Sequence, residues 1–270
     1  MPDSSGAPVA TGMIRTEVRG AVLEVILDAP AKLNSIDEQG LKDLAQALAN
    51  ARPAAERGEI RALLLRGEGK AFCAGRDIAG VDPATDDVPG YLDGLTAPAM
   101  EALHSFPAPS FAAVQGACLG VGLGLALACD VVYVGERAKL GSPFANLGAA
   151  LDSGGHWLLT QRLGTHRALD LIYTGELMGG AEAVASGLFS RVVPDDELLA
   201  FARERAERVA DGATGALLAS KELVFEVRDG LGFDASLAAE TRVQESLRTT
   251  EHYVEGFAAF REKRRPVFKH

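Results

Sequence analysis

Two stretches that contain several small residues decide how this chain folds: KAFCAGRDI at 70–78 and QGACLGVGLGLALACD at 115–130. Each follows an apolar run, at 60–65 and 110–114, that has the composition of a buried strand. Small residues at the end of a strand allow a tight turn whose backbone N–H groups stay open to a ligand. Two such N–H groups facing one oxygen atom would stabilise negative charge on it. Either turn alone is better explained as an ordinary strand-to-helix connection, so only the pair suggests a site.

Strands and helices alternate around these two turns. Apolar runs at 23–27 and 131–134 predict two more strands. The segment 37–49, with Asp37 as its N-cap, predicts a helix, and a glycine-rich helix is expected from about residue 120. Alternation of this kind is typical of the α/β class with a mainly parallel sheet.

Beyond Gly164 the sequence has nearly continuous helical periodicity, and only 190–193 has the composition of a strand. The helical segments expected there are 167–173, 181–186, 197–210, 216–227 and 237–260. We therefore expect three parts: a disordered lead-in at 1–12, an α/β core at 13–195 and a helical C-terminal region at 196–270.

The overall composition indicates a globular protein with ample material for a core: 270 residues, 47% hydrophobic and 24% charged. The net charge of −10 argues against nucleic acid and membrane partners, because acidic partners require an excess of Lys and Arg on a contact face. The basic residues between 261 and 269 fit a solvated helix end better than a phosphate site. The most apolar stretch, 116–129, is short and glycine-rich, which favours a buried helix over a membrane span.

The cysteines and the N-terminal residues indicate the cellular compartment in which the protein is expected. Cys73, Cys118 and Cys129 lie among small apolar residues, and an odd number does not fit a disulfide framework. We expect three buried, reduced thiols, which suit the cytoplasm. The opening MPDSSGAPVATGM lacks the basic and apolar regions of a signal peptide. A cytoplasmic location is therefore expected.

Common cofactor and metal motifs are missing. The glycine cluster that begins at Gly120 has leucine at 125 and 127, where G-x-G-x-x-G needs glycine, and no Walker A lysine follows it. There is no G-x-S-x-G, C-x-x-C or H-E-x-x-H, and the five histidines are scattered, so each is expected to be structural or exposed. We expect neither a metal ion nor a bound cofactor.

Taken together, the two turns and their spacing resemble the crotonase superfamily, which contains the enoyl-CoA hydratases and isomerases. The likeness spans nearly the whole chain: LNSID at 33–37, FCAGRDI at 72–78, PSFAAVQGACLGVG at 109–122, ACDVVYVGERAKLGSP at 128–143, TGELMGGAEAVASGLFSRVV at 174–193 and EGFAAFREKRRPVF at 255–268. The resemblance implies a core of ββα turns wound into a spiral, a helical trimerisation region and a homotrimer or hexamer. It also implies an acyl-CoA thioester as the substrate and a role in fatty acid metabolism.

The resemblance also implies which residues form the site. The oxyanion hole would be the backbone N–H groups of Arg76 and Val121, although most relatives have glycine where this chain has Val121. The residues expected to bind coenzyme A and substrate are Lys32, Leu33, Ala74, Asp77, Ile78, Gly120, Phe144 and Leu147. No other cofactor is implied.

The chain departs from the hydratases at the residues that perform the reaction. Hydratases with two catalytic glutamates carry them at the positions that match Gly124 and Phe144. Neither residue can hold or activate a water molecule or transfer a proton. A standard hydratase mechanism is therefore not expected.

Asp152 is the candidate replacement. In PFANLGAALDSGG at 143–155 it is the single formally charged side chain between Lys139 and Arg162. An acid at this position resembles Δ3,Δ2-enoyl-CoA isomerases and ring-1,2-epoxyphenylacetyl-CoA isomerases. Apolar neighbours such as Phe144 would raise its pKa towards neutrality. We therefore expect an isomerase in which Asp152 is the single acid and base.

Three alternatives stay open. Asp152 can instead be the N-cap of a helix at 153–163, with no role in the reaction. The chain can be a non-catalytic acyl-CoA binder that has kept the fold and lost both glutamates. It can also be a thioester hydrolase or dehalogenase in which Asp152 is the nucleophile, as in the related 4-chlorobenzoyl-CoA dehalogenases.

Overall fold

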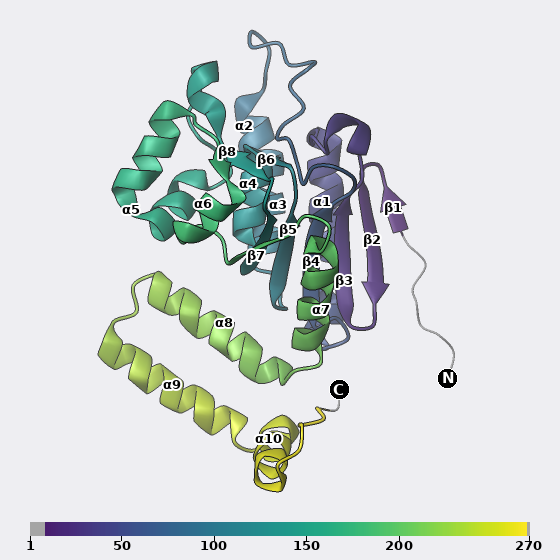
Figure 1. Cartoon of the computed structure of the whole chain (residues 1–270), viewed down its shortest axis with the longest axis vertical. Coiled ribbons are helices and arrows are strands. Elements are labelled where there is room, and N and C mark those ends of the chain that lie inside the picture. The colour runs from purple at the N-terminus through teal and green to yellow at the C-terminus, as the bar shows by residue number, and fades with distance from the viewer. Residues whose placement is uncertain (1–8, 269–270) are drawn as a thin grey trace.

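A computed structural model describes residues 9–268 of the chain (Figure 1). The main sheet has seven strands in the order β1-β2-β3-β4-β5-β7-β10, and a small sheet has three in the order β6-β8-β9. The strands are β1 (Val9–Thr11), β2 (Ile14–Arg19), β3 (Val22–Leu27), β4 (Ala62–Gly67), β5 (Ser110–Val114), β6 (Ala117–Leu119), β7 (Val131–Gly135), β8 (Lys139–Gly141), β9 (Met178–Gly179) and β10 (Arg191–Val193).

The helices fill the connections between these strands. The α-helices are α1 (Glu38–Glu56), α2 (Val88–Tyr91), α3 (Ala97–His104), α4 (Val121–Ala128), α5 (Gly155–Thr174), α6 (Gly180–Ala185), α7 (Leu198–Ala210), α8 (Thr214–Arg228), α9 (Phe233–Leu247) and α10 (Glu251–Glu262). Two 3₁₀ helices, η1 (Pro30–Lys32) and η3 (Pro143–Leu147), and one π-helix, η2 (Leu92–Thr96), complete the set. Across 9–268, no helix is both long enough and apolar enough to cross a bilayer.

The sheet is antiparallel at its first edge and parallel beyond it. Strands β1, β2 and β3 pair antiparallel, whereas β3, β4, β5, β7 and β10 pair parallel. After β5 and after β7, the chain first adds a short strand to the small sheet and then forms a helix before it returns to the main sheet. The α/β class and the ββα spiral that the resemblance implies are therefore confirmed.

The local predictions are confirmed where the hydrophobic pattern is strong. The strands expected at 23–27, 110–114 and 131–134 are β3, β5 and β7. Asp37 caps α1, and its carboxylate accepts a hydrogen bond from the backbone N of Gly40 at 2.8 Å. These elements depend on local sequence, which is why they could be predicted.

Two local predictions are wrong. The stretch 82–90, DPATDDVPG, is polar and contains Pro and Gly, a composition that predicts a loop. It already contains the start of α2, because Asp87 caps that helix by accepting from the backbone N of Gly90 at 3.0 Å. The helix expected at 237–260 is two helices, α9 and α10. The side chain of Thr250 accepts a hydrogen bond from Tyr253 N and so begins a new helix.

Helices cover the two faces of the main sheet differently. Leu63 and Leu65 of β4 belong to the buried cluster that includes the apolar face of α1. Leu64 belongs to a separate buried cluster that includes Ala202 of α7. The helix α7 lies against the main sheet (Figure 1). Since α7 covers the sheet, the core extends to about residue 210, beyond the expected boundary at 195.

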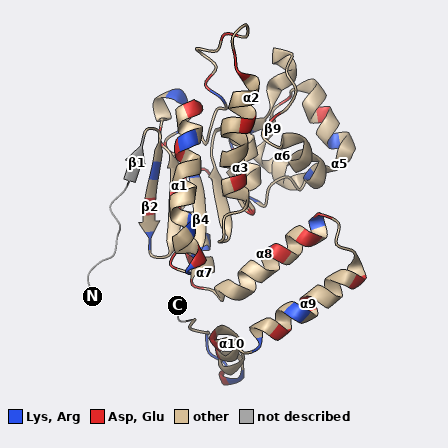
Figure 2. Ribbon diagram, turned by 180° about the vertical axis from the view of Figure 1, so that it is seen from behind, with Lys and Arg blue, Asp and Glu red and all other residues tan. Residues whose placement is uncertain are grey.

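The last three helices project away from this core (Figure 1). Lys and Arg alternate with Asp and Glu along α8, α9 and α10, so these helices present no basic face (Figure 2). At the other end, residues 1–8 of the expected lead-in lie outside the described residues, and Val9–Thr11 form β1.

A buried ion-pair network joins α7 to the sheet. Glu24 of β3 is 1% exposed and lies among three guanidinium groups, of which that of Arg19 is 3.1 Å from its Oε1. Arg203 of α7 donates to it at 2.6 and 2.9 Å, and Arg66 of β4 donates at 3.0 Å. Burial alone raises the pKa of Glu24, but the hydrogen bonds from Arg203 and Arg66 outweigh it and hold the pKa below the ordinary 4.5.

Replacing Glu24 with Gln should lower the free energy of unfolding by about 3 kcal/mol at pH 7, because the buried Arg66 and the partly buried Arg203 lose their counter-charge. A depressed pKa contributes stability that is complete above the unfolded value and is lost as the pH falls through the folded value. The difference in the free energy of unfolding between the wild type and Glu24→Gln should therefore become smaller below pH 4.5. Urea unfolding from pH 7 to pH 3 measures both effects. Glu59→Gln, which breaks a surface pair with Arg57, is the control and should change little.

Candidate active site

A cavity of about 670 Å³ lies where the two small-residue turns meet the segment around η3; we call it the first cavity. Its walls come from the turn after β4, the turn between β6 and α4, α2 with the loop before it, and the residues from η3 to the start of α5. The lining residues include Ala74, Arg76, Ile78, Asp86, Tyr91, Gly120, Val121, Phe144, Leu147 and Asp152. Seven of the eight expected binding and oxyanion positions on the two turns and η3 line this cavity together with Asp152, and only Asp77 does not.

The first turn carries Arg76. Its neighbours are held by backbone hydrogen bonds to Ile36, which donates to Gly75 O at 2.9 Å and accepts from Asp77 N at 3.0 Å. Within residues 9–268, the backbone N–H of Arg76 itself donates to no protein acceptor. This N–H group is therefore available at the cavity wall.

The second turn carries Val121, the first residue of α4. Leu119 N donates to Cys73 O at 2.9 Å, and Gly120 N donates to Gly141 O at 3.0 Å, so the backbone before Val121 is tied to both the first turn and β8. The Val121 N–H has no acceptor in the part of the chain that the structure describes. It belongs to a helix N-terminus, where unpaired N–H groups carry partial positive charge. The two predicted donors are thus both free and line one cavity.

Asp152 lies in a tight turn before α5. The helix begins at Gly155, not at residue 153, and Gly154 occupies the N-cap position without a side-chain cap. The Asp152 carboxylate accepts from the Ser153 hydroxyl at 2.7 Å, and within the described residues it accepts from no backbone N–H of α5. The alternative that Asp152 caps this helix is therefore wrong.

The surroundings of Asp152 favour its neutral form. Burial raises the pKa of this carboxyl above the ordinary 3.8, while the hydrogen bond from Ser153 and the charge of Arg76 oppose the rise. No ion pair compensates for the burial among the residues that the structure describes. Its pKa therefore lies closer to neutrality than that of an exposed aspartate.

Gly124 makes room for the turn that holds Asp152. A Cβ atom at position 124 would lie 2.8 Å from Cβ and 3.1 Å from the backbone O of Ser153. The position where hydratases carry one acid is thus occupied by the residue next to Asp152. Phe144, at the other such position, lies over Gly120 and forms part of the cavity wall.

The side chain of Arg76 has partners that sequence reasoning missed. Its guanidinium group forms a two-bond ion pair with Asp86, at 2.9 and 2.6 Å, and stacks 3.8 Å above the ring of Tyr91. Tyr91 is buried, and burial raises the pKa of its phenol to about 12. The composition of the polar stretch around Asp86 contains no signal that marks this residue as part of the site.

The other expected coenzyme A residues lie beside the first cavity rather than in its lining. Lys32 pairs with Asp77 at 2.8 Å, and Leu33 O accepts from Ala74 N at 3.0 Å. They are therefore attached to the first turn. Leu33 is 45% exposed, so its side chain is accessible next to the cavity.

A second cavity of about 720 Å³ also borders Asp152. It is lined mainly by η2, α3 and the start of α5, and Leu92, Leu151 and Asp152 line the first cavity as well. Its further lining includes Ala97, Met100, His104, His156, Trp157, Leu158 and Arg228. Asp152 therefore stands between two spaces, each large enough for a small organic ligand.

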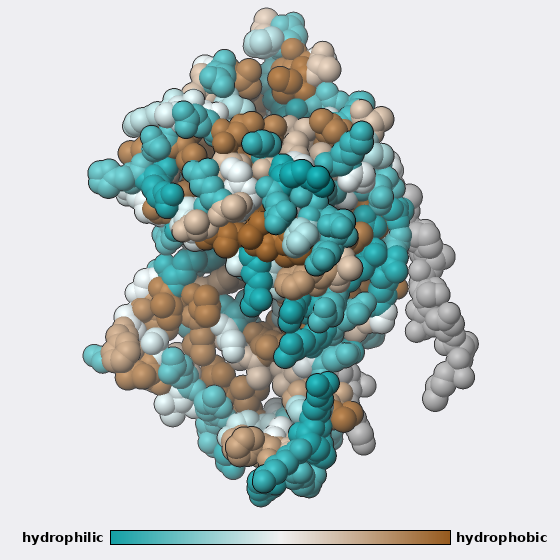
Figure 3. All heavy atoms as spheres, viewed as in Figure 1, coloured by the Kyte–Doolittle hydropathy of each residue, from teal (hydrophilic) through white to brown (hydrophobic). Residues whose placement is uncertain are grey.

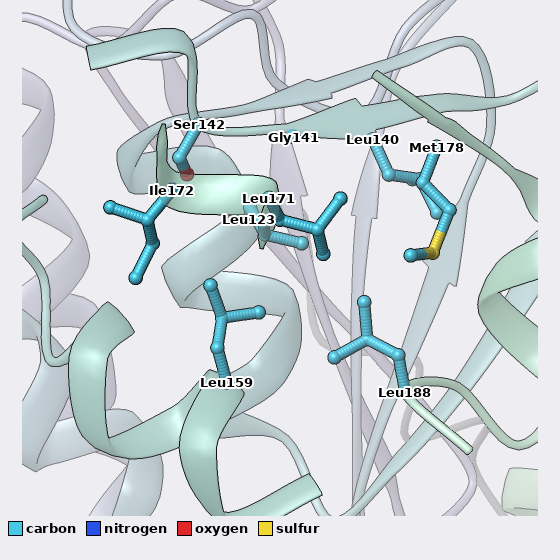
Figure 4. A pocket seen from close by; sticks show the side chains of 9 residues that line it. All are labelled: Leu123, Leu140, Gly141, Ser142, Leu159, Leu171, Ile172, Met178 and Leu188. Carbon is cyan, nitrogen blue, oxygen red and sulfur yellow. The ribbon is translucent and has the colours of Figure 1, made fainter. Parts of the chain in front are cut away.

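Two other hollows in the described residues do not include Arg76, Val121 or Asp152 in their lining. A third cavity is only about 10 Å³, and apolar side chains surround it almost completely (Figure 4). Cys73, Cys118 and Cys129 are buried and free, as expected, and burial raises the pKa of each thiol. In the described residues, no three His, Cys, Asp or Glu side chains are grouped as they would be to hold a metal ion.

Known proteins resemble this chain over almost its full length. The sequence model of the family described as enoyl-CoA hydratase/isomerase matches residues 17–270. "Probable enoyl-CoA hydratase" proteins of Rhizobium meliloti and Rhodobacter capsulatus are 39% and 35% identical, with 94% of this chain and 96% and 97% of theirs covered. The solved structure of an enoyl-CoA hydratase from Bacillus anthracis is 32% identical, with a TM-score of 0.86 over 95% of this chain and 99% of that one. The chain therefore belongs to the enoyl-CoA hydratase/isomerase family.

Proposed function

We propose that this protein is an enoyl-CoA isomerase that moves a double bond with Asp152 as its single acid and base. The observation that carries the proposal is the position of Asp152, which lines the same cavity as the two free N–H groups of Arg76 and Val121. The substrate is a 3-enoyl thioester of coenzyme A or a related thioester.

The proposed reaction needs one base and one place for negative charge. The Asp152 carboxylate removes a proton from C2 of the acyl group, and the resulting dienolate places its charge on the thioester oxygen. The N–H groups of Arg76 and Val121 donate to that oxygen, and each such donor contributes roughly 10²–10³ in rate. Asp152 then returns the proton at C4, so that the double bond moves from C3 to C2. A raised pKa suits this role, because the protonated intermediate becomes accessible.

The same geometry argues against the reaction that the relatives' names describe. Adding water requires a group that holds and activates the water molecule. Gly124 and Phe144 occupy the positions of the two hydratase glutamates, and Ser153 fills the space beside Gly124. Asp86 and Asp152 both line the first cavity, but Asp86 is paired with Arg76, which leaves Asp152 as the candidate base.

Replacing Asp152 with Ala should lower kcat/KM for 3-hexenoyl-CoA by about 10²–10⁴, because proton transfer loses its positioned base. Absorbance of the conjugated 2-enoyl-CoA product measures the rate. The base form is active, so kcat/KM of the wild type should rise with pH through the pKa of Asp152. That inflection should lie above the ordinary 3.8, since the pKa is raised.

Asp170→Ala, on the exposed side of α5, is the matched control and should leave the rate unchanged. Unchanged activity of Asp152→Ala would contradict the assignment. Micromolar binding of enoyl thioesters without turnover would favour the non-catalytic binder. Label from ¹⁸O-water in Asp152 after a single turnover would instead indicate a nucleophile.

The second cavity is the space into which we propose that the acyl group extends. Since Asp152 borders both cavities, C2 and C4 can face its carboxylate while the thioester lies in the first cavity and the rest of the acyl group lies in the second. Met100, Leu158 and Trp157 give this second space an apolar lining. Long or bulky acyl groups should therefore be accepted.

Ala97→Trp should fill part of the second cavity and lower kcat/KM for 3-dodecenoyl-CoA by at least about tenfold, because several methylene groups lose their apolar site. The rate with 3-hexenoyl-CoA should stay within a factor of two to three. Ala97→Ser leaves the volume almost unchanged and is the control. An equal loss with both substrates would contradict this place for the acyl group.

The projecting helices are the surface through which we propose that the chain forms a trimer. Exposed apolar side chains gather on α8, α9 and α10, and brown spheres cover the face between α8 and α9 (Figure 3). They include Val224, Val227, Phe233, Leu237, Val254, Phe257 and Phe260. A groove of about 410 Å³ lies on the same helices. Apolar surface of this extent is uncommon on a monomer.

Phe257→Asp should convert the trimer to monomers, because a charge at a contact between apolar faces is costly to bury. Light scattering coupled to size exclusion measures the mass of both proteins. Glu245→Gln, which changes a surface residue of α9 paired with Arg248, should leave the mass unchanged. A monomeric wild-type protein at micromolar concentration would contradict the proposed trimer.

A further inference from the structure

Arg76 contributes to the site twice, through its backbone N–H and through its side chain. The guanidinium group does not enter the cavity freely, because Asp86 accepts two hydrogen bonds from it at 2.9 and 2.6 Å. The ring of Tyr91 lies beneath it at 3.8 Å. Two-bond pairing and ring stacking both restrict the orientation of a guanidinium group. The side chain is therefore held against α2 and the loop before it.

The charge of Arg76 reaches Asp152 although the two residues form no ion pair. The positive charge of Arg76 lowers the pKa of Asp152 and so opposes the rise that burial causes. Other ionisable groups line the two cavities that Asp152 borders: Tyr91 of α2, Asp93 of η2, Glu101 and His104 of α3, His156 of α5 and Arg228 of α8. Arg76 is the cation among them that acts on Asp152 directly.

We propose that Asp86 is a positioning residue: it holds the Arg76 guanidinium group on the Tyr91 ring and away from Asp152, so that Asp152 stays free to exchange a proton with the substrate. This inference rests on the proposed function of Asp152. A guanidinium group released from Asp86 has the first cavity as its nearest open space, since both residues line it. There it would pair with Asp152, the carboxylate that lacks a cationic partner within residues 9–268.

The arrangement has a second effect on the first turn. The pair joins residue 76 to residue 86 and so closes the loop between them at the cavity wall. The backbone N–H of Arg76 belongs to that same turn. Asp86 therefore supports the orientation of the N–H group as well as the position of the charge.

Asp86→Asn tests this inference. It keeps the size of the side chain and removes the charge, so Arg76 should move towards Asp152 and lower the pKa of that carboxyl. Carboxyl-carbon NMR of protein labelled with ¹³C-aspartate measures that titration directly, and the signal that disappears in Asp152→Asn gives the assignment. The acid limb of kcat/KM should shift to lower pH by the same amount, and kcat should fall roughly tenfold.

The double variant Asp86→Asn/Arg76→Met separates charge from structure. It removes the cation, so the pKa of Asp152 should return to the wild-type value or above, even though the loop still lacks its ion pair. Asp82→Asn is the matched control, because that carboxylate accepts from Ala84 N at 3.0 Å in the same loop and does not line the first cavity. Its titration should match the wild type.

An unchanged Asp152 titration in folded Asp86→Asn would overturn the inference, and a thermal unfolding curve shows whether the variant is folded. The NMR measurement requires no turnover. Failure of the wild type to isomerise any 3-enoyl-CoA would therefore count against the proposed function alone. A loss of activity in Asp86→Asn without a shift in either titration would assign the residue a purely structural role.

Discussion

The structure depends on the close contact between the two small-residue turns. Cys73 and Cys118 form an isolated parallel bridge, and the main chain around them is joined by hydrogen bonds from Cys73 N to Ala117 O and from Leu119 N to Cys73 O. The contact leaves no space for a side chain at position 122, where a Cβ would lie 2.5 Å from Cys73 O. Because backbone meets backbone here, two N–H groups can face one cavity without any side chain supplying them.

The turn that holds Asp152 packs directly against Gly124. A side chain at 124 would require this turn to shift, since its Cβ would lie 2.8 Å from the Cβ of Ser153. The small residue at 124 and the place of the Asp152 turn are therefore linked by packing. The scaffold keeps two free N–H groups at one cavity wall, and the isomerase proposed above differs from the hydratases in the group that moves the proton.

Elements with strong local signals could be predicted from the sequence. The strand at 110–114 and the cap at Asp37 rest on hydrophobic pattern and side-chain chemistry within a few residues. Helices between 88 and 104 were not predicted, because η2 depends on packing against α1 and α3, and α2 on its contact with η2, more than on periodicity. Similarly, α7 has the sequence of a surface helix, and its pairing with Glu24 across the sheet assigns it to the core.

The sequence by itself determined the order of strands and helices, the two small-residue turns and the absence of an acid at positions 124 and 144, because these are properties of residue type and spacing. Only the tertiary structure decided that the Asp152 side chain is free of its helix, that Asp86 pairs with Arg76 and that Asp152 borders two cavities. These features depend on distances between side chains that are far apart along the chain, or on the orientation of one carboxylate. Such distances and orientations follow from how the elements pack, and a local sequence pattern does not determine that packing.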